Sequence, residues 1–171
     1  MKKIFAALWL IALTFNTACS DDSSTNATSG TESWRDYCVD KINEYRATEN
    51  VAPLKKADVD KQKCVTKQAA NDLSSNKAHG HFGDCGEHAQ NSGPNISMGR
   101  YKSNEEIIDS YLDMMWSEKK LVESGARDPD KVEDYPYIGH YLNMKTTAVS
   151  VACGIATNSD ETIGWLNINF H

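Results

Sequence analysis

A glycine-rich stretch near the middle of the chain, residues 78–91, concentrates the side chains that could carry out chemistry. It holds three of the five histidines, His79, His81 and His88, together with Glu87. Glycine permits turns that other residues resist, so this segment can aim an imidazole and a carboxylate at one point. Imidazole nitrogens and carboxylate oxygens bind zinc and similar divalent ions. The same two groups can also serve as a general base and its orienting partner.

Two more residues of these types lie far downstream, namely Glu118 and His140. We expect them to share one pocket with His79 and Glu87, because the connecting segments can border a single sheet. The spacing alone does not match a known metal motif, since the chain has no H-E-x-x-H helix. An isolated histidine is more often a surface or hydrogen-bonded structural residue than a ligand. His171 is expected to be solvated.

The first eighteen residues predict an export signal. A short basic start is followed by an apolar run over residues 4–15, which is too short to remain as a spanning helix. Cys19 follows Thr17 and Ala18 in a pattern that resembles a bacterial lipobox, whose cysteine is lipidated and becomes the mature N-terminus. We therefore expect an exported cell-envelope lipoprotein with a surface anchor, on the outer membrane or the cell surface. The alternative is a secreted protein that has lost Cys19.

Charge excludes one class of partner. Removing residues 1–18 takes away two lysines and no acids, so the formal net charge changes from −6 to −8. An acidic chain without a cluster of Lys and Arg is not expected to bind nucleic acid. The only membrane association expected is through the lipid anchor.

Four cysteines remain after Cys19, and an even number in an exported chain indicates two disulfides. Three pairings are open from the sequence alone. We favour Cys38–Cys64 and Cys85–Cys153, because the first pair would join two neighbouring helices. A cysteine metal site is not expected, because none of the four lies in a C-x-x-C pattern.

The order of the expected elements predicts an α+β class. Residues 19–33 are polar, without apolar periodicity, and are expected to form a flexible tether. The domain then covers residues 34–171. We expect three helices in it, then a loop, then two alternating strands that form a hairpin. The predicted features are a helix from Trp34 capped by Ser33, a helix over 58–73 capped by Asp58, a short strand over 88–91 and a turn over 91–95, a helix opened by a Ser103–Glu106 capping box, a loop over 125–137, and strands over 147–153 and 165–170.

From Trp34 to His171 the chain resembles the CAP superfamily of cysteine-rich secretory proteins, antigen 5 and plant pathogenesis-related proteins. The resemblance rests on several short motifs in the right order and at the right separations. These are Ile42-Asn43-Glu44-Tyr45-Arg46, Ala78-His79-Gly80 with Cys85-Gly86-Glu87, Met115-Trp116-Ser117-Glu118, Gly139-His140-Tyr141-Leu142-Asn143 and Val151-Ala152-Cys153-Gly154. Three departures stand out: His88 replaces the usual Asn, Asn143 replaces Gln, and His81 competes with His79 as the first histidine.

The resemblance implies a three-layer α-β-α sandwich around a small antiparallel sheet. It also implies a cleft with two histidines and two glutamates, here His79, Glu87, Glu118 and His140, that can bind a divalent cation such as zinc. The family does not fix one activity. We favour a binding module for a small molecule, lipid or peptide over an enzyme. The alternatives are a metal-dependent hydrolase, for which no G-x-S-x-G motif is present, and a disulfide-stapled surface scaffold with a vestigial pocket.

Overall fold

The computed structural model describes residues 29–171, and the expected signal peptide and Cys19 lie outside these residues. Helices come first, and most of the sheet is formed at the end of the chain. The elements are α1 (Ser29–Thr48), β1 (Lys55–Lys56), α2 (Val59–Ser75), β2 (Ala89–Ser97), η1 (Met98–Arg100), α3 (Asn104–Ser117), α4 (Lys119–Glu123), η2 (Val132–Asp134), α5 (Tyr135–Met144), β3 (Ser150–Thr157) and β4 (Ile163–Phe170).

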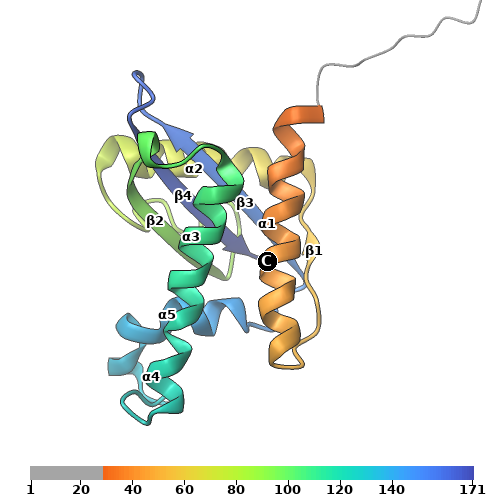
Figure 1. The fold of residues 1–171 in the computed structure, drawn as a ribbon, viewed down its shortest axis with the longest axis vertical. Helices are drawn as coiled ribbons and strands as arrows, with labels where there is room; N and C mark the ends of the chain where they lie inside the picture. Colours follow the sequence, from red (N-terminus) through yellow and green to blue (C-terminus); the bar gives the residue numbers. More distant parts are fainter. Residues whose placement is uncertain (1–28) are drawn as a thin grey trace, which may run out of the picture.

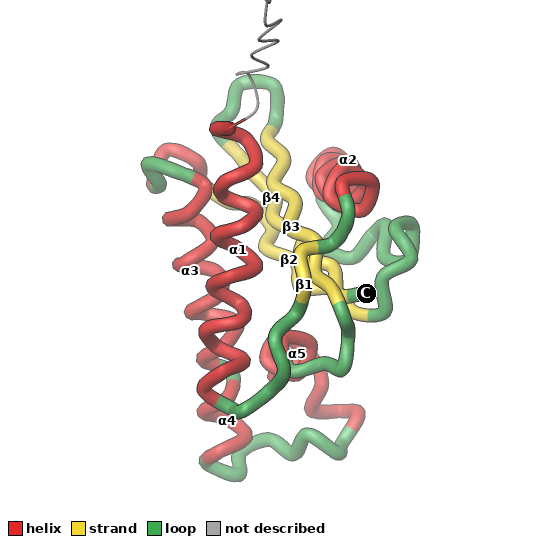
Figure 2. Tube along the Cα trace, turned by 90° about the vertical axis from the view of Figure 1, so that its right-hand side faces the viewer, coloured by secondary structure: helices red, strands yellow, loops and turns green. Residues whose placement is uncertain are grey.

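These elements form three layers. The sheet has the strand order β1-β3-β4-β2 and lies between α1 and α3 on one side and α2 on the other (Figures 1 and 2). The predicted β3–β4 hairpin is present, and β2 pairs antiparallel with the other side of β4. The α-β-α sandwich is therefore confirmed. The sheet is mixed rather than wholly antiparallel, because the two-residue β1 runs parallel to β3.

Local signals set two helix starts correctly. The Asp58 side chain accepts a hydrogen bond from the Lys61 amide at 2.9 Å, and Ser103 accepts one from the Glu106 amide at 3.4 Å. Each cap satisfies a backbone donor that the first turn leaves free. The predicted start of the first helix at Trp34 is wrong. Residues 29–33 are already part of α1.

The last strand divides the interior into two chemically different halves. Leu166, Ile168 and Phe170 belong to the large apolar core that α1 and α3 cover. Asn167 and Asn169 alternate with them and bond instead to side chains of α2. All five are fully buried, because successive residues of a strand point to opposite faces and both faces of this sheet are covered.

Two disulfides are present, as the number of cysteines predicted, but the pairing we favoured is wrong. Cys38 pairs with Cys153, and Cys64 pairs with Cys85. The helices that carry Cys38 and Cys64 lie on opposite sides of the sheet, which separates the two cysteines (Figure 2). Instead, each disulfide links two neighbouring segments: Cys38 joins α1 to β3, and Cys64 joins α2 to the glycine-rich loop.

Two other local expectations fail. Residues 91–95 form part of β2 rather than a turn, and an irregularity between Gly93 and Ile96 accommodates the proline there. The loop expected over residues 125–137 is interrupted by η2 and by the start of α5, the helix that carries His140. Along residues 29–171, none of the helices combines the length and the apolar character needed to cross a membrane.

Candidate functional site

The glycine-rich loop between α2 and β2 has an irregular backbone that the protein holds at several points. His79 adopts the left-handed conformation with φ of +58°. Few residues other than glycine do so, although histidine is enriched among them, and such conformations cluster at functional sites. The Cys64–Cys85 disulfide ties the far end of the loop to α2. The backbone therefore directs the His79 side chain out of the loop in a defined direction.

The orientation of the His79 ring follows from a chain of hydrogen bonds. The Gln90 side-chain nitrogen donates to Gln68 Oε1 at 2.8 Å and to Asn169 Oδ1 at 2.9 Å. These two bonds fix which end of the Gln90 amide is oxygen. That oxygen lies 2.8 Å from His79 Nδ1, so Nδ1 must carry the hydrogen. In the neutral ring, Nε2 then keeps its lone pair for a ligand.

His140 is oriented in the same manner, by a carboxylate. Its Nδ1 lies 2.6 Å from Glu118 Oε1, and the Tyr141 amide donates to Glu118 Oε2 at 3.1 Å. Glu118 lies just after α3, and His140 lies on α5, so the pair joins the two helices. The carboxylate can only accept, so His140 Nδ1 carries the hydrogen and Nε2 is again the free nitrogen.

An ion cluster holds α5, and hence His140, against the rest of the domain. The Glu49 carboxylate, at the end of α1, lies 2.6 Å from Lys119 Nζ and 2.8 Å from Lys145 Nζ. Hydrogen bonds from these two lysines lower the pKa of Glu49 to about 2. The carboxylate therefore remains charged through the neutral and mildly acidic range, and it ties α1, α4 and α5 together.

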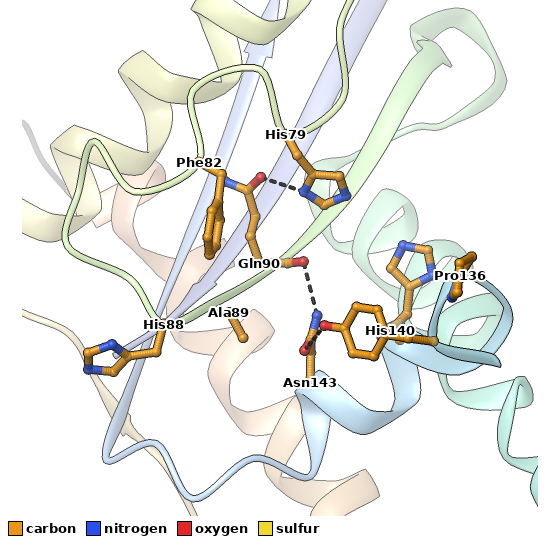
Figure 3. Close-up of a pocket in the computed structure, with 10 residues that line it drawn as sticks. His79, Phe82, His88, Ala89, Gln90, Pro136, His140 and Asn143 are labelled. Carbon is orange, nitrogen blue, oxygen red and sulfur yellow. Dashed lines mark hydrogen bonds between the residues drawn. The ribbon is translucent and has the colours of Figure 1, made fainter. Parts of the chain in front are cut away.

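His79 and His140 line the same cavity, which has a volume of about 480 Å³. Figure 3 shows them extending into it from the loop and from α5, with Gln90 and Asn143 to one side of the two rings and His88 lying apart. The lining residues are His79, Phe82, His88, Ala89, Gln90, Tyr135, Pro136, Gly139, His140 and Asn143. The structure thus brings together the two histidines that the family resemblance singled out.

Glu87 is not among the residues that line this cavity. Its side chain is buried, Oε1 accepts from the Gly83 amide at 2.8 Å and from Gln68 Nε2, and Oε2 accepts from the Cys85 amide at 3.0 Å. Three donors already surround the carboxylate, which stabilises its charge. Glu87 therefore holds the loop in shape. Glu118 does not line the cavity either, and it affects the cavity only by orienting His140.

The four-residue metal set expected from the resemblance is accordingly not assembled. Within residues 29–171, no three His, Cys, Asp or Glu side chains are grouped in a way that could hold a metal ion. The rivalry between the two loop histidines is also resolved. His81 turns to α2, where its Nδ1 lies 2.7 Å from the buried Asp72 carboxylate, and it does not line the cavity. His171 is buried rather than solvated.

Sequence reasoning missed Gln90, which orients His79, and three residues that shape the cavity. Gln90 and Asn143 are buried polar residues, and Phe82 and Tyr135 are aromatic residues that remain about half exposed. Only Asn143 carried a signal in the sequence, because it stands where the family motif has another amide. The other three have ordinary residue types, and their roles depend on which strand or helix faces them.

The sequence and the fold agree on the class of protein. The family model of the cysteine-rich secretory protein family, CAP, matches residues 39–168. This range includes the Cys64–Cys85 disulfide and the cavity, and it begins one residue after Cys38 of the other disulfide. The chain belongs to this family. Its layers, its two disulfides and its paired histidines define an extracellular CAP-domain module. Comparison with curated proteins finds no relative that matches the chain.

Proposed function

We propose that this CAP domain is an exported binding module whose cavity holds a divalent cation, zinc by preference, through Nε2 of His79 and Nε2 of His140. One observation carries the proposal. Each imidazole has its Nδ1 engaged by a side-chain oxygen, of Gln90 or of Glu118, while its other nitrogen is left for the same cavity. Metal-binding histidines typically have this arrangement, in which the outer partner fixes the tautomer and increases the basicity of the ligand nitrogen.

The donors fit zinc in kind, with fewer protein ligands than the family resemblance implies. Two neutral imidazoles suit a borderline divalent ion, and zinc accepts four ligands in a tetrahedral arrangement. The two remaining positions are left to water or to a ligand in the cavity. A bound ion would supply Lewis acidity to that ligand. The protein would contribute the two fixed rings and a partly enclosed space.

Binding is favoured over hydrolysis by the state of the carboxylates. A metal-dependent hydrolase needs a general base close to the attacking water. Both candidates are occupied elsewhere: Glu87 by the loop amides and Gln68, and Glu118 by His140 and the Tyr141 amide. Among residues 29–171, no carboxylate lines the cavity. The cavity is therefore better suited to holding a ligand than to activating water.

The two disulfides support an oxidising location outside the cytoplasm. The proposal includes attachment of the domain to the cell envelope through lipid on Cys19, with the residues after it as a spacer. Cys19 lies outside the described residues, and its motif is the support for this part of the proposal.

Zinc titration of the purified, untagged protein by calorimetry tests the metal site. We expect one zinc per chain, and affinity that is roughly tenfold or more weaker in His140→Ala and in His79→Asn. Asparagine is chosen at position 79 because it tolerates the left-handed backbone that the loop requires there. Glu118→Gln should also weaken binding by roughly tenfold, because the outer partner of His140 loses its charge.

His81→Ala is the matched control, because this histidine lies on the same loop but bonds to Asp72 outside the cavity. Its zinc affinity should equal that of the wild type. The proposal is wrong if the wild type binds no zinc at millimolar concentration. It is also wrong if His81→Ala weakens binding as much as His79→Asn does.

A further inference from the structure

The polar groups at the base of the cavity are already used within the protein. Both ends of the Gln90 amide are bonded, to His79, Gln68 and Asn169. The Asn143 nitrogen donates to the Gln90 carbonyl and to Asn91 Oδ1, and its oxygen accepts from the Tyr135 hydroxyl at 2.7 Å. A ligand therefore finds few free hydrogen-bonding groups there. The free Nε2 atoms of the two inward-facing histidines are the main exception.

Most of the rest of the lining is apolar, and its two aromatic side chains are exposed. Phe82 is 49% exposed and Tyr135 is 47% exposed, although each lines the cavity. Ala89, Pro136 and Gly139 add further apolar surface. The Tyr135 ring lies against Gly139 so closely that a Cβ at Gly139 would lie 3.0 Å from a ring carbon. The wall beside His140 is thus a fixed aromatic surface that an apolar ligand could cover.

The charges around the cavity indicate what the polar end of the ligand must be. Among residues 29–171, neither a Lys or Arg nor an Asp or Glu lines the cavity. A divalent ion on two neutral imidazoles brings a formal charge of +2, and Glu118 behind His140 supplies −1. One positive charge is left without a partner in a half-enclosed, mainly apolar space. Such a charge is costly unless an anion accompanies it.

We infer that the ligand of this cavity is a small apolar monocarboxylate. The inference rests on the proposed metal site, and it deepens that proposal by naming the ligand class. The carboxylate balances the remaining charge beside His79 and His140. The hydrocarbon or aryl body of the ligand covers Phe82, Tyr135 and Pro136. A neutral alcohol lacks the charge, and a short acid such as acetate lacks the apolar body.

Calorimetric titration with 3-phenylpropanoate, of the zinc-loaded protein and of protein treated with a chelator, tests this inference. We expect the acid to bind the zinc-loaded protein roughly tenfold or more tightly than acetate does, because its ring covers apolar surface. The neutral analogue 3-phenylpropan-1-ol should bind roughly tenfold more weakly than the acid. Removing zinc should abolish the difference between acid and alcohol.

Phe82→Ala separates this inference from the metal site, because the exposed Phe82 ring makes none of the hydrogen bonds that orient the two imidazoles. The Phe82 amide, which donates to the His79 carbonyl at 3.3 Å, is kept in the variant. The variant should bind zinc as the wild type does and lose roughly tenfold in affinity for 3-phenylpropanoate. Zinc binding without preference for the acid over the alcohol and acetate overturns the ligand class and leaves the metal site standing. Unchanged acid affinity in Phe82→Ala also overturns it. Failure of zinc itself to bind overturns both.

Discussion

The two faces of the sheet are equally buried but are held by different forces. Ile168 and Asn167 are neighbours on β4, and neither is exposed. Ile168 packs into the apolar core under α1 and α3. Asn167 donates to Asp72 on α2 and accepts from Ser92 on β2. Strand β4 thus contributes side chains to both an apolar half and a polar half of the interior.

The polar half is the one that builds the candidate site. From α2, Gln68 bonds the His81 carbonyl and Glu87 of the loop, and it also fixes the Gln90 amide that orients His79. Asp72 holds the His81 ring. Hydrogen bonds are directional, whereas burial of apolar surface is not. A polar interior can therefore set the position of a loop and of a ring, while the apolar half supplies most of the stability.

Each half contains one disulfide, and removing them separately gives the largest expected effects. The Cys38–Cys153 bond closes a sequence separation of 115 residues, and the Cys64–Cys85 bond closes one of 21. The longer loop loses more freedom in the unfolded chain. We expect the free energy of unfolding to fall by about 5 kcal/mol in Cys38→Ala/Cys153→Ala and by about 3 kcal/mol in Cys64→Ala/Cys85→Ala, as measured by urea unfolding.

The loss of zinc affinity should be larger in Cys64→Ala/Cys85→Ala than in Cys38→Ala/Cys153→Ala, which is the opposite of the order expected for the loss of stability. Loss of Cys64–Cys85 releases the loop that carries His79, so affinity should fall there. The folded fraction of the Cys38→Ala/Cys153→Ala variant should bind as the wild type does. Equal zinc affinity in the two double variants would show that the polar half does not hold the loop as described.

The neighbours on β4 provide the sharpest test of the comparison. Asn167→Leu keeps the approximate volume but leaves the buried Asp72 carboxylate and the Ser92 hydroxyl each short of a partner. We expect a loss of about 3 kcal/mol in the free energy of unfolding. Ile168→Val removes one methylene from the apolar half and should cost about 1 kcal/mol. If Asn167→Leu is as mild as Ile168→Val, the polar contacts do not contribute as proposed.

The smallest expected effect is a dependence of stability on pH that arises from His171. Burial lowers the pKa of this imidazole below its usual 6.5. Lys61 and His88 act in the same direction, while the Gly86 carbonyl and Glu87 oppose them. Its Nε2 is buried without a hydrogen-bond partner. His171 takes up a proton near pH 6.5 in the unfolded chain and only at lower pH in the folded protein. Its contribution to the free energy of unfolding is therefore complete above pH 6.5 and is lost as the pH falls.

Urea unfolding between pH 7.5 and pH 5 measures this dependence, and His171→Gln is the control. The wild type should lose more stability over that interval than the variant does. Parallel pH profiles for the two proteins would mean that His171 takes up its proton in the folded state as readily as in the unfolded chain.

Sequence alone determined the features that depend on neighbours along the chain. The caps at Asp58 and Ser103 and the alternation on β4 were all readable, because each involves residues within a few positions of one another. The ordered family motifs also identified the CAP fold and the two histidines that line the cavity. In these cases residue type and spacing were sufficient.

Only the tertiary structure decided the contacts between distant segments. The disulfide pairing depends on which side of the sheet each helix covers, and Cys38 and Cys64 lie on opposite sides. Glu87 has the residue type of a metal ligand, but the loop folds its own amides around the carboxylate. His79 and His81 are two positions apart, yet one meets Gln90 and the other meets Asp72. The left-handed backbone at His79 turns its side chain away from that of His81, and a sequence pattern does not specify this φ angle.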